Sequence, residues 1–159
     1  MTTIQVEVRK DIRRPLAVVS RQFGDIAHHA RNRVHPDVTF TVLGDDGATC
    51  RFRQQVRVAG MLQSDELVQR RTADGSLVAD VVAGANKGMR IVQAFAPLGA
   101  DATRVTFRAD APATGLKRLL KPLFERALGF STAGLVDLAP LAGHDGVKNG
   151  RHGHHSREK

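Results

Sequence analysis

The spacing of apolar residues changes partway along this 159-residue chain, and that change limits the fold more than any other feature. From Val38 to Asp110, apolar and polar residues alternate with a period of two, in segments separated by turn sequences such as GDDG, ADGS and GANKG. Such alternation is typical of strands with one buried and one solvent-facing side. Beyond residue 113 the period becomes about 3.6, as in an amphipathic helix. We therefore predict six antiparallel strands followed by a long C-terminal helix.

The N-terminal segment adds a seventh strand and two short helices. Residues 3–12 alternate in the same way as the later strands. Pro15 then stands where the first residue of a helix is expected, and Gly24 should end that helix. A second helix is expected over residues 25–34, because a proline at position 36 disfavours helical angles in the residue before it. The predicted class is α+β, with a seven-stranded antiparallel sheet and two short helices after the first strand.

The C-terminal part divides into a helix and a tail. Thr114 is the expected cap of the long helix. Pro122 should kink this helix or mark a late start, because proline lacks the backbone N–H that a helix interior needs. Residues 143–159 are rich in glycine, histidine and charge and show no periodicity. We expect this tail to be disordered, so that the folded domain covers residues 1–142.

Composition and charge narrow the function classes. The chain carries a formal net charge of +8 but has no Trp, no Tyr and seven Phe. Proteins that bind single-stranded nucleic acids use exposed aromatic side chains for stacking, so we predict no sequence-specific nucleic-acid binding. The charge would allow peripheral contact with an anionic membrane. Cys50 is the single cysteine, which excludes an internal disulfide and a cysteine-built zinc site.

The expected location follows from the first residues. They alternate apolar and polar side chains and lack the apolar core of a signal peptide, and no apolar run in the chain is long enough to span a membrane. We therefore expect a cytoplasmic protein, and the sequence leaves its oligomeric state open.

The predicted strand at residues 49–58 has two clearly different faces. Its apolar face includes one glutamine, and its other face carries three arginines: Cys50, Phe52, Gln54 and Val56 alternate with Arg51, Arg53 and Arg57. A slip of one residue in the strand register would exchange the two faces. This assignment therefore decides which side chains point into the core.

Three segments resemble the START/SRPBCC superfamily: IQVEVRKDIRRPLAVVSRQFGDIAHHARNRVHPDV at the start, GMRIVQAFAPLGADATRVTFRADAP in the last hairpin, and GLKRLLKPLFERAL in the final helix. The resemblance covers residues 3–142 and rests on the order of the elements. It implies a helix-grip fold, in which a seven-stranded antiparallel sheet curls around a long C-terminal helix and encloses a deep hydrophobic pocket. Members of the superfamily bind lipids, sterols, polyketides, quinones or plant hormones, and some are cyclases or hydrolases.

In such a fold, the inner strand faces and the final helix would line the pocket. Gln54 and Gln93 are the polar members of this set. Buried glutamines need hydrogen-bond partners, which a ligand can supply; an error in the assumed strand register is the alternative explanation. The expected ligand-binding residues are Cys50, Phe52, Gln54, Val56, Gln93, Phe95, Phe107, Leu123 and Phe130.

The segment GDIAHHARNRVHPD contains Asp25, His28 and His35. It resembles the iron-binding motif of Rieske-type ring-hydroxylating oxygenases, with Asp137 of the final helix as the third ligand. Two histidines and one carboxylate suit non-haem iron, but six residues separate the two histidines here where the motif has four. We therefore predict no metal site and no cofactor, and we interpret the segment as a polar helix at the mouth of the pocket.

Candidates for catalytic chemistry are few. His35 is the main candidate for acid/base chemistry, followed by Asp65, and Cys50 is expected to behave as a small hydrophobic residue. An enzyme needs at least one titratable group with a suitable pKa in its pocket. We therefore predict a non-catalytic protein that binds a hydrophobic small molecule such as a lipid, sterol, quinone or polyketide-like compound. The alternatives are an enzyme of the same fold, either cyclase/dehydratase-like or oxygenase-like with iron at His28 and His35, and a regulatory protein with a vestigial cavity.

Overall fold

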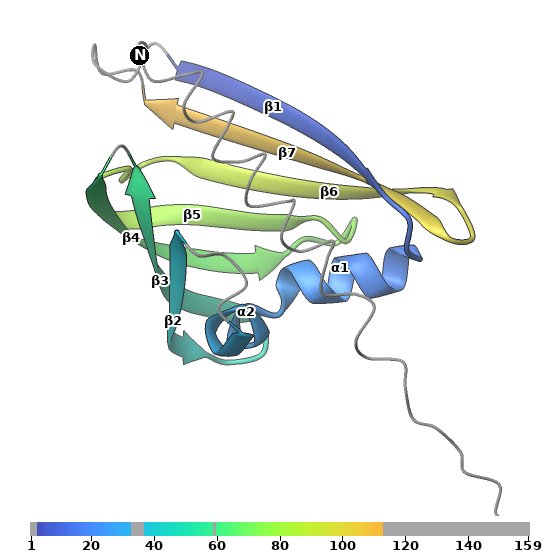
Figure 1. Ribbon diagram of the computed structural model, residues 1–159, viewed down its shortest axis with the longest axis horizontal. Coiled ribbons are helices and arrows are strands. Elements are labelled where there is room, and N and C mark those ends of the chain that lie inside the picture. The colour runs from blue at the N-terminus through green and yellow to red at the C-terminus, as the bar shows by residue number, and fades with distance from the viewer. Residues whose placement is uncertain (1–2, 33–36, 59, 113–159) are drawn as a thin grey trace, which may run out of the picture.

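The computed structural model describes residues 3–32, 37–58 and 60–112 of the chain. The elements in chain order are β1 (Thr3–Ile12), α1 (Leu16–Gly24), α2 (Ile26–Asn32), β2 (Val38–Asp45), β3 (Thr49–Val58), β4 (Met61–Arg71), β5 (Leu77–Gly84), β6 (Arg90–Gly99) and β7 (Ala102–Pro112) (Figure 1). The predicted seven-stranded sheet and the two helices after the first strand are confirmed. The predicted C-terminal helix and the tail at residues 143–159 lie outside the described residues.

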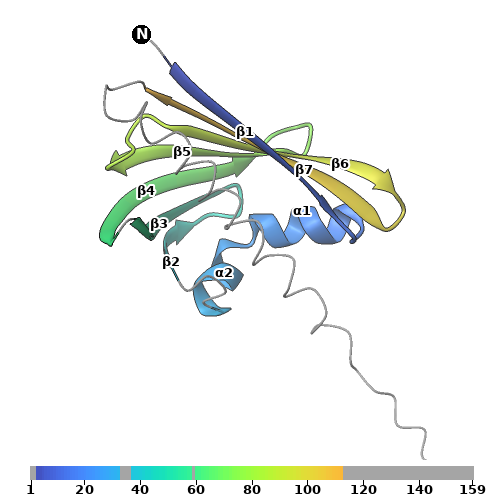
Figure 2. The ribbon, with the colours of Figure 1, turned by 45° about the horizontal axis from the view of Figure 1, so that its top comes forward.

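The strands form one antiparallel sheet in the order β1-β7-β6-β5-β4-β3-β2. The first and last strands of the described chain are neighbours, paired from Thr3 with Pro112 to Ile12 with Thr103. The sheet is strongly curved, and both helices lie on the same side of it (Figures 1 and 2). Helix α1 contacts β6 and β7, and α2 contacts β2. We call the side of the sheet that carries Phe107 and faces the helices the inner face, and the opposite side the outer face.

The helix boundaries follow from local chemistry. Pro15 directly precedes α1 and has φ −57° and ψ 146°, which lies outside the helical region. The prediction that Pro15 is the first helical residue is therefore wrong by one position. Helix α1 ends at Gly24 as predicted. Helix α2 is described over Ile26–Asn32, and the rest of the predicted helix falls in residues 33–36, which lie outside the described ranges.

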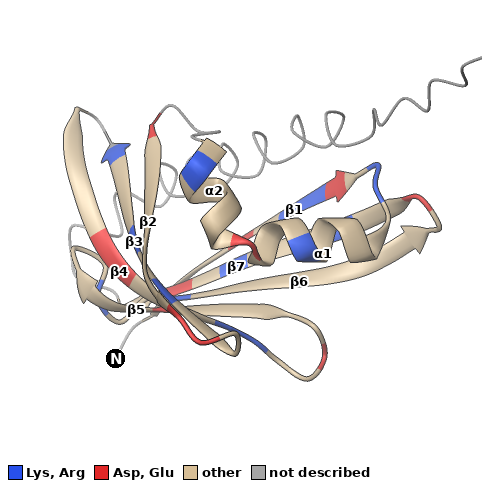
Figure 3. Cartoon of the chain, turned by 90° about the horizontal axis from the view of Figure 1, so that it is seen from below, with Lys and Arg blue, Asp and Glu red and all other residues tan. Residues whose placement is uncertain are grey.

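The outer face carries charge pairs between neighbouring strands, and Figure 3 marks where the charged residues fall along the chain. Asp80 on β5 accepts hydrogen bonds from Arg90 on β6 at 2.6 Å and from Arg70 on β4 at 2.9 Å. Glu66 on β4 similarly accepts hydrogen bonds from two arginines of β3, at 2.8 and 2.9 Å. The arginines of the segment 49–58 are exposed, which confirms the predicted outward orientation of Arg51, Arg53 and Arg57.

Candidate functional site

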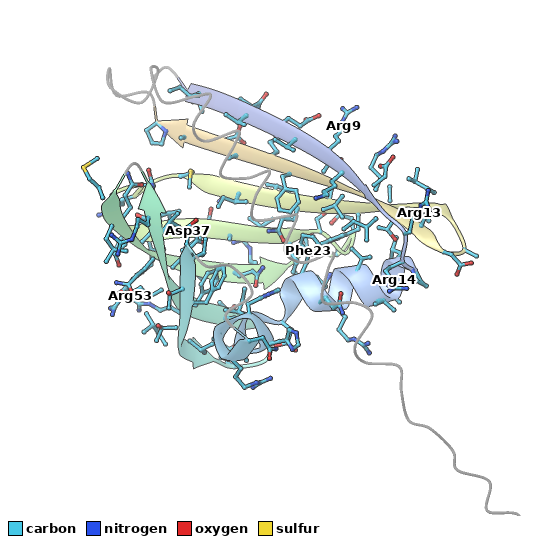
Figure 4. The ribbon with its side chains drawn as sticks, viewed as in Figure 1. Arg9, Arg13, Arg14, Phe23, Asp37 and Arg53 are labelled. Atoms are coloured by element: carbon cyan, nitrogen blue, oxygen red, sulfur yellow. The ribbon has the colours of Figure 1, made fainter. Side chains whose placement is uncertain are left out.

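The inner face holds two apolar clusters, and the first of them packs against α1. Residues paired directly across an antiparallel sheet point to the same face, so β5, β6 and β7 contribute neighbouring side chains. Phe23 of α1 points toward the sheet (Figure 4), and its ring centroid lies 5.6 Å from those of both Phe95 and Phe107. The buried members are Ile12, Val19, Phe23, Leu77, Val105 and Phe107, with Val8 and Phe95 partly buried.

The second cluster lies against α2. Phe52 of β3, which is only 3% exposed, packs with Ile26 of α2 and with Leu67 of β4. Phe40 on β2 brings its ring centroid to 6.0 Å from that of Phe52. The remaining members are the buried Ala79 and Val81 and the partly buried Val42, Cys50, Met89 and Ile91.

Both clusters therefore combine fully buried and partly buried apolar side chains on one face. In a solid core the central side chains are covered on all sides, because protein interiors are close-packed. Ile91 is instead partly buried although its two cross-strand neighbours, Ala79 and Ala109, are buried. The inner face thus presents apolar surface that a ligand could cover, and covering such surface favours binding by about 25 cal/mol per Å².

Gln93 of β6 lies within the first cluster. It pairs with Leu77 on one side and with Phe107 on the other, so its side chain is on the inner face as predicted. Its amide oxygen Oε1 is buried and accepts no hydrogen bond from any residue within the described ranges. An unsatisfied buried acceptor costs about 1–3 kcal/mol. Gln93 is therefore a polar group that would gain a partner from a suitable ligand.

Gln54 of β3 also faces inward, between Phe40 of β2 and Asp65 of β4. The carboxylate of Asp65 has a structural role, because Oδ1 accepts from the backbone N–H of Asn86 at 2.8 Å and Oδ2 from its Nδ2 at 2.6 Å. These bonds fasten the turn between β5 and β6 to β4. The turn also needs Gly84, at φ 107°, because a Cβ at this position would collide with the carbonyl oxygen of Ser64.

The structure brings most of the predicted pocket residues onto the inner face. Phe52 and Phe107 are buried cluster members, whereas Cys50 and Phe95 are partly buried beside them. Val56 is half-buried near the end of β3 and belongs to neither cluster. The remaining two predicted residues, Leu123 and Phe130, lie outside the described ranges.

The histidine-rich segment forms α2 and the residue before it. The side chain of Asp25 caps α2, since Oδ1 accepts from the backbone N–H of His28 at 2.8 Å. The Nδ2 atom of Asn32 donates to the carbonyl oxygen of His28 at 3.1 Å. Within the described ranges, no group of three or more His, Cys, Asp or Glu side chains is placed to hold a metal ion. The two other residues of the compared iron motif, His35 and Asp137, lie outside those ranges.

His29 and Cys50 are titratable groups close to the second cluster. His29 is 6% exposed, its ring centroid lies 5.9 Å from that of Phe40, and its Nε2 donates to the carbonyl oxygen of Gln22 at 2.8 Å. Burial raises the pKa of the Cys50 thiol, and the negative charges of Asp45 and Asp25 raise it further. Because the thiolate is the nucleophilic form, Cys50 is poorly suited to nucleophilic catalysis at neutral pH.

Sequence reasoning missed two features of this face. Gln69 is buried on β4 between Cys50 and Ala79, and the alternation of its strand with Leu67 could have identified it. Arg71 at the end of β4 donates to Oγ of Ser20 at 2.7 Å and to its carbonyl oxygen at 3.0 Å, which ties α1 to the sheet. No pattern in the sequence indicates that contact, because it joins residues far apart in the chain.

A family model described as polyketide cyclase / dehydrase and lipid transport matches residues 3–142. Similar solved structures share the fold at low sequence identity. An aromatase/cyclase from a Streptomyces species has a TM-score of 0.74 at 15% identity, covering 86% of this chain and 93% of that chain. A START superfamily protein from Mycobacterium smegmatis has a TM-score of 0.71 at 15% identity, covering 84% and 94%. Norcoclaurine synthase from Thalictrum flavum has a TM-score of 0.69 at 11% identity, covering 87% of each chain.

These likenesses confirm the predicted START-type fold. A search among curated proteins found no match. In the part of the chain that the structure describes, no helix combines the length and apolar composition needed to cross a membrane.

Proposed function

This chain belongs to the polyketide cyclase/dehydrase and lipid transport family, and we propose that it binds an apolar small molecule against the inner face of its sheet without transforming it chemically. The observation that carries this proposal is the composition of the inner face, where apolar side chains lie around Gln93, whose amide oxygen accepts no hydrogen bond from the described residues. An apolar surface with a few convergent polar groups is typical of small-molecule sites.

The described inner-face groups favour binding over catalysis. Asp65 uses both carboxylate oxygens to hold the backbone N–H and side-chain amide of Asn86. The thiol of Cys50 has a raised pKa and is therefore mostly protonated at neutral pH. A general base must be free to approach the reacting proton, whereas Asp65 is held by the turn between β5 and β6 and Cys50 keeps its proton at neutral pH.

A cyclase or dehydratase activity is the second candidate. The family description names both reactions, and His29 places a titratable imidazole beside Phe40 at the edge of the second cluster. His35, the residue predicted for acid/base chemistry, stays a candidate from the sequence because it lies outside the described ranges. Under this alternative, His29→Gln would abolish turnover of a bound ligand while retaining its binding.

Native mass spectrometry of the purified protein tests the proposal. We expect a small organic molecule to co-purify with the protein and to be released unchanged after prolonged incubation. We also expect the uncharged fluorophore N-phenyl-1-naphthylamine to bind to the emptied protein and to raise its melting temperature, since a ligand that binds only the folded state stabilises it. A protein that carries no such molecule and does not bind the fluorophore would contradict the proposal, and a ligand that changes mass during incubation would favour the enzyme.

A further inference from the structure

The side chains around Gln93 indicate the chemistry of the ligand more narrowly than the polarity of the Gln93 amide does. Its side chain lies in a row across the inner face that runs from Val8 on β1 through Phe107 on β7 to Leu77 on β5. Every neighbour in this row is apolar. Phe95, two residues along β6 on the same face, adds an aromatic ring that contacts Phe23. The Gln93 amide is therefore the polar group in a row of aromatic and aliphatic side chains.

Two other buried polar side chains, one on β7 and one in the turn between β5 and β6, have protein partners. Thr103 is fully buried on β7, and its hydroxyl donates to the carbonyl oxygen of Arg14 at 2.9 Å. Asn86 is buried and donates to both oxygens of Asp65. Buried polar groups in native proteins are nearly always satisfied in this way. The buried Oε1 of Gln93 accepts no hydrogen bond from the residues that the structure describes, which leaves it available to a ligand on the inner face.

We propose that Gln93 determines which apolar ligands the site accepts, and that its Oε1 accepts a hydrogen bond from a ligand hydroxyl group. The proposal rests on the proposed binding function. An amide oxygen has lone pairs and no proton, so the preferred ligands are alcohols and phenols. Quinones, esters and ethers offer only acceptor atoms and would leave Oε1 unsatisfied. The rings of Phe23, Phe95 and Phe107 beside the amide favour a ligand whose hydroxyl is carried by a ring.

Three probes of nearly equal size separate these classes: 2-naphthol, 2-methoxynaphthalene and naphthalene. Their dissociation constants would be measured by displacement of N-phenyl-1-naphthylamine from the full-length protein. We expect 2-naphthol to bind about 3- to 10-fold more tightly than the other two, the range that one net hydrogen bond provides. Gln93→Met keeps the length of the side chain and removes its amide, so it should abolish the preference by weakening only the binding of 2-naphthol.

The matched control is Gln55→Met, the same chemical change on the outer face of β3, where the preference should be unchanged. Equal binding of all three probes to the unmodified protein would overturn the inference and leave the proposed function intact, as would a preference that survives Gln93→Met. Tighter binding of 2-methoxynaphthalene would also overturn it, because the amide would then present its NH2 group. Failure of all three probes and of the fluorophore to bind would instead refute the proposed function.

Discussion

At Gln93 a buried amide oxygen lies between Leu77 and Phe107 and accepts no hydrogen bond from the part of the chain that the structure describes. Selection for stability alone would favour an apolar residue at this position, because an unmade hydrogen bond in the interior carries the desolvation penalty of the polar atom. Natural proteins commonly give up stability at sites that serve function. The cost of this residue to the empty protein can therefore be measured apart from any ligand.

Gln93→Met should stabilise the ligand-free protein. Removing the unsatisfied amide while keeping a side chain of similar length is expected to raise the free energy of unfolding by about 1 kcal/mol, which corresponds to roughly 2–6 °C in melting temperature for a domain of this size. Urea unfolding and thermal melts of the emptied protein would measure the change. A loss of stability in Gln93→Met, with Gln55→Met unchanged, would mean that the amide already has a partner in the folded protein.

At the scale of single elements, α2 depends on Asp25, the residue that directly precedes it. The carboxylate of Asp25 accepts the backbone N–H of His28, and a helix as short as Ile26–Asn32 gains little from propensity alone. Asp25→Ala should lower the free energy of unfolding by about 1 kcal/mol. Asp25→Asn retains the cap and serves as the control. Equal losses in both variants would assign the effect to the charge of Asp25 rather than to its hydrogen bond.

The charge pairs on the outer face predict that the stability of the protein depends on pH. Hydrogen bonds from Arg90 and then Arg70 hold the pKa of Asp80 below its usual value. The pKa of Asp80 is thus lower in the folded protein than in the unfolded chain. The stability that Asp80 contributes is therefore fully present above the unfolded-state pKa of about 3.9. It is lost as the pH falls through the folded-state pKa. Asp80→Asn should be less stable than the unmodified protein at neutral pH, and the two should converge in acid. Urea midpoints measured from neutral to strongly acidic pH would show this, and a constant difference would contradict it.

At the scale of the whole molecule, the proposed function requires room for a ligand on the inner face. Ile91 of β6 tests this well, because it is half-buried between two buried alanines of the neighbouring strands, Ala79 and Ala109. Ile91→Trp should fill such a space, leave stability nearly unchanged and abolish fluorophore binding. In a solid core the same substitution would overpack and cost about 1–3 kcal/mol. Val92→Trp on the outer face is the control, and it should retain binding.

Much of this architecture could be predicted from the alternation of apolar and polar residues along each strand. The inward positions of Phe52, Gln54 and Gln93 followed from a period of two, since each strand places every second residue on the same face. Gly24 was identified as the end of α1 because glycine ends helices readily. Pro15 was misplaced by one residue, since its fixed φ suits both the first helical position and the one before it. These are local properties, which a chain carries before it folds.

The partners of the side chains were not predictable in the same way. The sequence by itself determined that strands would pair into an antiparallel sheet with one apolar and one arginine-rich face, because the alternation of side chains is set by backbone geometry within each strand. Only the tertiary structure decided that Asp65 holds a turn, that Arg71 ties α1 to the sheet, and that Oε1 of Gln93 accepts no hydrogen bond from the described residues. Each of these depends on which distant residues the curved sheet brings within hydrogen-bonding distance. That depends on the register and curvature of all seven strands together.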